Sequence, residues 1–174
     1  MANVDQAIDF VLSQEDSKMS GHVTTLKGDS GGATRFGIAS KYHPELIEEG
    51  YFDENKVGRV AALVTAEHIY THDYANPLLL WQIKDQKLAN AVLSFAINAG
   101  VRTAAKMLQH AVDAFPDGMI GQATLHAVNT GDPVNFLAEF SELARQHYQQ
   151  IVANNSSQLR FLNGWLNRVN AWTA

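Results

Sequence analysis

With 174 residues, of which 46% are hydrophobic and 18% charged, the chain has the composition of one soluble globular domain and not of a disordered or fibrous protein. Its formal net charge of -5 argues against a nucleic-acid-binding protein, which needs an excess of lysine and arginine to neutralise phosphates. The absence of cysteine excludes disulfides, cysteine zinc sites and a thiol nucleophile.

The amino-terminal residues predict an amphipathic helix from Val4 to Glu15, because apolar residues recur there at the spacing of one helix face. Asn3 is the expected N-cap of this helix. Residues 16–38 are rich in serine, threonine and glycine, and they predict a small β-hairpin with strands at residues 23–26 and 34–38. This segment is the least helical part of the chain.

The rest of the sequence predicts helices separated by Pro77, Gly100 and a turn at residues 115–118. We expect these helices at residues 44–49, 65–74, 85–99, 103–114, 121–129 and 133–154, with a last helix from residue 156 to the end. No stretch is long and apolar enough to span a membrane. The sequence therefore predicts a mostly α-helical single domain with a small β-hairpin near the N-terminus.

Glu15 is a carboxylate on the apolar side of the first predicted helix. It follows Val4, Ile8 and Val11 at helical spacing, so it projects from the face that the helix buries. Partial burial and the negative end of the helix dipole would favour the protonated form that a glycosidase general acid needs. The alternative is a carboxylate at a frayed helix end that turns to solvent. Asp16 is a weaker candidate, because it is rotated about 100° from Glu15 if the helix continues.

The segment Asp29-Ser-Gly-Gly-Ala-Thr34-Arg-Phe-Gly-Ile38 is the second candidate for function. Its paired glycines permit positive φ and the close approach of a polymer, while Asp29 and Thr34 present a carboxylate and a hydroxyl from a tight turn. Considered alone, this pattern is that of an ordinary hairpin turn. Its position soon after Glu15 is what favours a functional interpretation.

Together, Glu15 and this segment resemble the amino-terminal signature of the glycoside hydrolase family 108 N-acetylmuramidases, in which a helix-end glutamate precedes D-x-G-G-x-T-x-x-G-I. The second half is similar to the predicted peptidoglycan-binding region of that family, through the runs Phe95-Ala-Ile-Asn98-Ala-Gly100, Met107-Leu-Gln109, Asp117-Gly-Met-Ile-Gly121-Gln-Ala-Thr124 and Gly164-Trp165-Leu-Asn-Arg168-Val169. The resemblance extends over nearly the whole chain, with the motifs in the expected order.

The resemblance implies a lysozyme-like fold and hydrolysis of the β-1,4 bond between N-acetylmuramic acid and N-acetylglucosamine, without a cofactor or a metal. It implies that Glu15 is the catalytic acid. We expect Asp29 to be a second catalytic group that orients or activates water, and Thr34 and Asn98 to bind substrate. Residues 1–90 are expected to form the catalytic lobe and residues 91–174 a helical, peptidoglycan-binding-like lobe, packed as one compact unit.

Two positions depart from the family pattern. The family usually has Glu-Gly-Gly where this chain has Glu15-Asp16-Ser17, and an aspartate often stands where this chain has Ser94. The first departure affects the backbone beside the acid. The second replaces a carboxylate that could serve packing or a cleft. Neither removes Glu15.

Several residues of the second half have structural alternatives. Asn98 is as compatible with a helix C-cap before Gly100 as with a cleft residue. Asp117 and the glycine after it favour a turn, and we expect Trp165 and Trp172 to belong to the core rather than to stack on sugars.

Two other functional classes compete with the enzyme. A non-catalytic wall-binding module would keep the carbohydrate groove, but it has no need of an acid on the apolar face of its first helix. A metal-dependent hydrolase could be built around His68 and His72, which stand one helical turn apart, but this spacing lacks an obvious third ligand.

The expected partner is the glycan strand of peptidoglycan, bound by a monomer that neither binds nucleic acid nor inserts stably into a membrane. The first residues lack the basic start and long apolar core of a secretory signal. We therefore expect synthesis in the cytoplasm and action in the periplasm or cell wall after export assisted by a holin or a secretion machine. Host-cell lysis by a phage or prophage is the preferred role, with a secreted antibacterial effector as the alternative.

Overall fold

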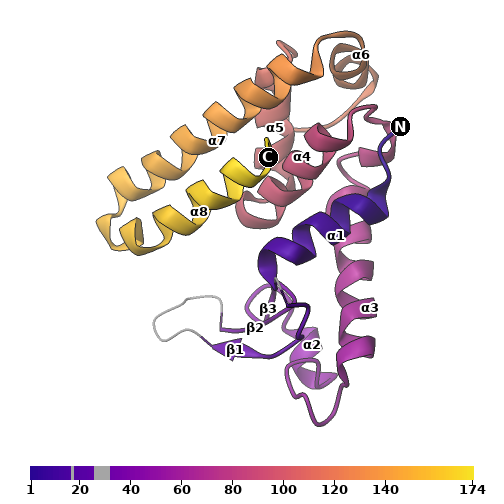
Figure 1. The fold of residues 1–174 in the computed structure, drawn as a ribbon, viewed down its shortest axis with the longest axis vertical. Coiled ribbons are helices and arrows are strands. Elements are labelled where there is room, and N and C mark those ends of the chain that lie inside the picture. The colour runs from indigo at the N-terminus through magenta and orange to yellow at the C-terminus, as the bar shows by residue number, and fades with distance from the viewer. Residues whose placement is uncertain (17, 26–31) are drawn as a thin grey trace. The chain divides into compact units, whose positions relative to one another are not determined.

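The computed structural model describes residues 1–16, 18–25 and 32–174. Its contacts divide the chain into two compact units, which we call the sheet unit (Ile8–His72) and the helical unit (Met1–Ala7 with Asp73–Ala174). These units are defined by packing and not by function. The functional division expected between residues 90 and 91 therefore stays a prediction. The described residues are mostly helical with a small sheet near the N-terminus, as predicted (Figure 1).

Helix α1 runs from Val4 to Glu15, the bounds expected from the sequence. Its start is capped as predicted, because the Asn3 side chain accepts a hydrogen bond from the backbone N–H of Gln6 at 3.2 Å. Its apolar face is buried through Ala7, Ile8, Val11 and Leu12. Burial of this face, and not helix propensity, accounts for a helix of this length.

The sheet unit contains three short antiparallel strands in the order β1-β2-β3, namely Thr24–Thr25, Ala33–Arg35 and Ile38–Ala39. In this register, Thr34 lies opposite Thr24 on one side and opposite Ala39 on the other. The prediction of one strand over residues 34–38 is wrong. A two-residue turn at Phe36 and Gly37 splits this stretch into β2 and β3.

Two helices complete the sheet unit, α2 (Glu45–Glu48) and α3 (Arg59–Ile69). Helix α3 begins before the predicted residue 65. The start was predicted too late because Val60 and Val64 are apolar but exposed, so the first turns do not show the periodicity of a buried face. It continues as a π-helix, η1 (Tyr70–Ala75), and such insertions often occur at functional sites.

The helical unit comprises α4 (Gln86–Ala99), α5 (Val101–Ala111), α6 (Gln122–Thr130), α7 (Pro133–Asn154) and α8 (Leu159–Ala171), with short 3-10 helices η2 (Leu80–Gln82) and η3 (Ser156–Gln158). Helices α7 and α8 run antiparallel and side by side (Figure 1). Asp85 and Asp132 cap α4 and α7 by accepting backbone hydrogen bonds at 2.8 and 2.9 Å.

The core of the helical unit is a cluster of aromatic rings around the fully buried Phe95 of α4. The ring centroids of Phe140, Tyr148 and Trp172 lie 5.7, 5.7 and 6.4 Å from that of Phe95, all with edge-to-face geometry. Trp165 stacks on Tyr148 at 5.0 Å. The prediction that Trp172 belongs to the core is confirmed, whereas Trp165 is half-buried at its margin.

None of the helices in the described ranges has the length and apolar character needed to cross a bilayer.

Candidate active site

Glu15 is the last residue of α1, and its side chain is half-buried within the sheet unit. The tip of the β2–β3 hairpin lies directly against it. A Cβ atom placed on Gly37 would come within 2.7 Å of Glu15 Cγ and 3.2 Å of its carboxyl carbon, and it would also collide with the Tyr70 hydroxyl. Only glycine permits this close packing, so the hairpin tip covers one side of the Glu15 side chain.

The turn at the hairpin tip has positive φ at both central residues, 48° at Phe36 and 78° at Gly37. This is the geometry of a type I′ turn, which glycine adopts freely but which costs about 1 kcal/mol or more for a residue such as phenylalanine. Two contacts hold Phe36 in place. Its ring is buried, and its carbonyl accepts a 2.7 Å hydrogen bond from the hydroxyl of Tyr70, the first residue of η1.

Arg35 precedes the turn and anchors β2 to the rest of the sheet unit. Its guanidinium is only 2% exposed and donates to three backbone carbonyls: Nε to Gly21 at 2.7 Å, and Nη1 to Tyr51 and Val57 at 2.8 Å each. A buried cation needs such partners to offset its desolvation. In return, the Tyr51 hydroxyl donates to the Arg35 carbonyl at 3.1 Å, and burial raises the pKa of this phenol, which keeps it a donor.

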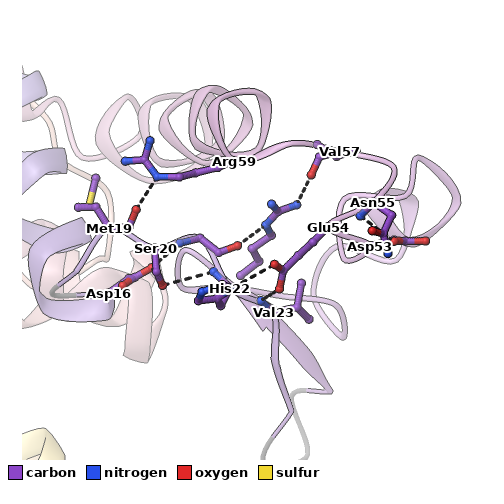
Figure 2. Close-up of polar contacts among 12 residues, drawn as sticks. Asp16, Met19, Ser20, His22, Val23, Asp53, Glu54, Asn55, Val57 and Arg59 are labelled. Carbon is purple, nitrogen blue, oxygen red and sulfur yellow. Dashed lines mark hydrogen bonds and ion pairs between the residues drawn. The ribbon is translucent and has the colours of Figure 1, made fainter.

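The loop after Glu15 is fixed by Asp16 and Arg59 (Figure 2). The Asp16 carboxylate accepts hydrogen bonds from the Ser20 hydroxyl at 2.9 Å and the Gly21 N–H at 2.7 Å, while Arg59 Nε donates to the Met19 carbonyl at 2.7 Å. Burial acts to raise the pKa of Asp16, but these hydrogen bonds outweigh it and the pKa is lowered. Asp16 is therefore an ionised loop anchor, which gives a structural reason for the departure from Glu-Gly-Gly.

A surface pair connects the same loop to residues 52–57. Glu54 accepts from the Val23 N–H at 2.8 Å and lies 3.1 Å from His22 Nδ1 (Figure 2). The hydrogen bond from Val23 is the main cause that lowers the pKa of Glu54. Both side chains of the pair are exposed, so its contribution to stability is small.

The other residues expected at the site lie in different settings. Thr34 is a half-buried residue of the central strand β2, and its side chain points to the sheet face opposite Arg35. Asp29 falls outside the described residues. Asn98 is an exposed residue within α4 of the helical unit, where its amide donates to the Ser94 carbonyl at 3.2 Å. Gly100 and not Asn98 ends that helix.

The sequence did not reveal the roles of two residues at the hairpin tip, Gly37, which packs against Glu15, and Tyr70, which holds the Phe36 carbonyl. Gly37 is the glycine of the G-I pair that ends the hairpin motif, but its contact with Glu15 depends on the turn that the sequence did not predict. Tyr70 carried no signal, because its role depends on a hydroxyl reaching a carbonyl 34 residues away.

Two sets of motif residues in the second half are structural. Gln109 is buried and its amide donates to Asp117, the Met119 carbonyl and Thr124, while the Gly118 N–H donates back to it at 2.9 Å. This network holds the turn expected at Asp117 and connects α5 to α6. The hydrogen bond from Gln109 is the largest cause that lowers the pKa of Asp117. Ser94, in turn, is fully buried, so an aspartate at its position would place a carboxylate in the protein interior.

The His68 and His72 rings lie 5.5 Å apart, centroid to centroid, and both side chains are exposed. Within the described ranges, no group of three or more histidine, aspartate and glutamate side chains could hold a metal ion.

Glu15 is thus a half-buried glutamate at a helix end that packs against the glycine of a hairpin tip, in a mostly helical chain. Residues 8–100, more than half of the chain, match the family described as Glycosyl hydrolase 108, and the protein belongs to this family. Residues 101–170 match the family described as Predicted Peptidoglycan domain. Together these matches make the protein a peptidoglycan muramidase.

A solved structure is similar over almost the whole chain. The structure of Brucella abortus SagA superposes with a TM-score of 0.74 and 26% sequence identity, over 97% of this chain and 90% of that one. Among curated proteins, no match was found.

Proposed function

We propose that Glu15 is the general acid of this muramidase. It donates its proton to the oxygen of the β-1,4 bond between N-acetylmuramic acid and N-acetylglucosamine as the bond from the anomeric carbon to that oxygen breaks. The single observation that carries the proposal is the packing of Gly37 against the Glu15 side chain. The close approach of Gly37 limits the orientations that the Glu15 carboxyl can take.

The neighbouring carboxylate supports the choice of Glu15. Asp16 is occupied by hydrogen bonds from Ser20 and Gly21, and its pKa is lowered, although burial alone would raise it. A carboxyl held in its ionised form cannot serve as an acid near neutral pH. Glu15 is the other carboxyl at this end of α1, and its side chain is half-buried.

We assign the second catalytic task, orienting or activating water, to Asp29 with help from Thr34. The assignment of Asp29 rests on its place in the hairpin motif, and that of Thr34 on its place in β2, two residues before the turn that covers Glu15. A separation of roughly 6.5 to 9.5 Å between the two carboxyls would give inversion at the anomeric carbon, and about 5 to 5.5 Å would give retention. Asn98 remains a proposed substrate contact.

The test is Glu15→Gln, which keeps the shape of the side chain but cannot donate the proton. We expect the release of new reducing ends from purified peptidoglycan to fall on the order of 10² to 10⁴-fold, with the melting temperature unchanged within experimental error. Asp9→Asn is the matched control, because Asp9 lies exposed on the same helix. Full activity of Glu15→Gln would remove Glu15 from the mechanism. Intact glycan with cut peptides would contradict cleavage of the glycan strand.

Asp29→Asn and Thr34→Ala test the second task. We expect both to lower kcat with little change in melting temperature. An Asp29→Asn variant of wild-type activity would assign water activation to another group.

For the biological role, we propose lysis of a bacterial cell from within, by a phage or prophage enzyme that acts in the periplasm or cell wall. The presence of a muramidase and a predicted peptidoglycan region in one chain supports this role. Co-expression with a holin should cause lysis if the role is correct. An antibacterial effector would instead be delivered by a secretion machine and would require an immunity protein in the producing cell.

A further inference from the structure

A groove of about 380 Å³ lies between α5 and α7 of the helical unit. Both helices belong to residues 101–170, which match the predicted peptidoglycan family. The groove is lined by Thr103, Lys106, Met107, His110, Leu143, Gln146, His147 and Gln150. Its volume is within the range of sites that bind small ligands, and it is not used by the proposed cleavage.

The lining of the groove has one formal positive charge and many hydrogen-bonding groups, in a protein whose formal net charge is -5. It contains the ammonium group of Lys106, two imidazoles and two amides, and no carboxylate. Lys106 is exposed and makes no ion pair with any of the described residues. Met107 and Leu143 supply an apolar part. This chemistry is complementary to a small anionic ligand that also has apolar side chains.

His147 is held in position before any ligand binds. Its ring meets those of Phe95 and Tyr148 edge to face, with centroids 5.4 and 5.8 Å apart. Burial lowers the pKa of His147, so its imidazole is neutral near pH 7 and offers one donor and one acceptor.

The two glutamines of α7 present acceptors. The Gln146 amide nitrogen donates to Glu142 at 3.1 Å and that of Gln150 donates to Asn154 at 2.9 Å. Their carbonyl oxygens can therefore accept from the N–H groups of a peptide. Glu142 also lies 3.8 Å from Arg145, which offsets its negative charge next to the groove.

We propose that this groove binds the stem peptide of peptidoglycan, with Lys106 pairing with a peptide carboxylate and the α7 glutamines accepting from peptide N–H groups. The inference rests on peptidoglycan being the substrate. Of the two parts of peptidoglycan, the peptide fits better than the glycan. Sugar rings stack on aromatic side chains, and no phenylalanine, tyrosine or tryptophan lines the groove. The carboxylates of the stem peptide supply the charge that the lining lacks.

The test is binding of a free stem tripeptide, L-alanyl-γ-D-glutamyl-meso-diaminopimelate or its lysine analogue, to the full chain by calorimetry and by NMR of the histidine rings. We expect saturable binding that shifts the His147 and His110 resonances. Lys106→Gln should weaken the affinity about tenfold or more, because it removes a charge-assisted contact at an exposed position. Lys87→Gln is the matched control, since Lys87 is exposed on α4 and the substitution removes the same charge.

Three outcomes would overturn the proposal: no binding of either tripeptide, equal affinity of Lys106→Gln and wild type, or displacement of the peptide by the neutral sugar chitotetraose. Failure of the proposed catalysis is distinguishable. Glu15→Gln should bind the tripeptide with the affinity of the wild type, whether or not it has lost the cleavage activity.

Discussion

Each of the two units is stabilised internally, and the interactions differ between them. In the sheet unit, strands of two or three residues are tied to loops by buried or part-buried polar groups, above all the guanidinium of Arg35 on three carbonyls. In the helical unit, long helices pack around the aromatic rings that surround Phe95. A structure held by hydrogen bonds from a few buried side chains depends on each of them, whereas the stability of an aromatic core is distributed over many contacts. The proposed acid, Glu15, lies in the sheet unit.

The largest loss of stability is expected from Phe95→Ala in the helical unit. Removing a fully buried ring at the centre of four aromatic contacts should lower the free energy of unfolding by about 3 to 5 kcal/mol, measured by chemical denaturation. Phe115→Ala is the control, because Phe115 is 83% exposed and its loss should have almost no effect. Equal effects of the two variants would contradict the aromatic core.

Arg35→Met should be next in size and should affect the sheet unit. It leaves three carbonyl groups without their donor, so we expect a loss of about 3 kcal/mol together with most of the muramidase activity. Arg145→Met is the control in the helical unit, where the guanidinium lies 3.8 Å from Glu142 and donates an exposed hydrogen bond to Asn170 at 3.1 Å, so we expect a loss of about 1 kcal/mol. A stable and active Arg35→Met variant would show that the hairpin does not need this anchor.

Gly37→Ala tests whether the position of the Glu15 side chain affects activity more than it affects the stability of the fold. The methyl group would be placed at a φ of 78° and against Glu15 and Tyr70, so we expect a loss of about 1 to 2 kcal/mol in stability. The loss of activity should be larger, on the order of 10²-fold, because Glu15, the proposed acid, would be displaced. Gly58→Ala in the same unit is the control, since a Cβ there meets no atom within 4 Å. Wild-type kcat in Gly37→Ala would contradict the proposed contact.

The smallest expected effect is a decrease in the stability of the helical unit at low pH, caused by protonation of His147. Because burial lowers the pKa of His147 below its usual 6.5, the unfolded chain takes up a proton more readily than the folded one as pH falls through 6.5. The stability that depends on neutral His147 is therefore complete above pH 6.5 and decreases below it. The melting temperature should fall slightly from pH 7 to pH 5, and less in His147→Gln. An imidazole that titrates above 6.5 by NMR would reverse the sign.

The sequence predicts best where structure is local. The bounds of α1 and α7 and the turn at Asp117 follow from periodicity, capping residues and turn chemistry within a few positions. The sheet unit was less predictable, because the split of residues 34–38 depends on a tyrosine hydroxyl from η1 and on the side chain of Glu15. Gln109 was identified as part of a motif, but its role was not predicted, because a hydrogen-bond network produces no regular spacing in the sequence.

The helical unit also has a consequence for how the chain can be shortened. Its first residues are part of it: the Ala2 N–H donates to the Ile83 carbonyl at 2.6 Å, and the Asn3 N–H donates to the Gln86 side chain at 2.7 Å. The aromatic core, in turn, takes Phe95 and Trp172 from outside residues 101–170. A fragment cut at the bounds of the predicted peptidoglycan family would lack both rings and the N-terminal segment. Any isolated wall-binding piece therefore has to include residues well beyond the family bounds to keep its core.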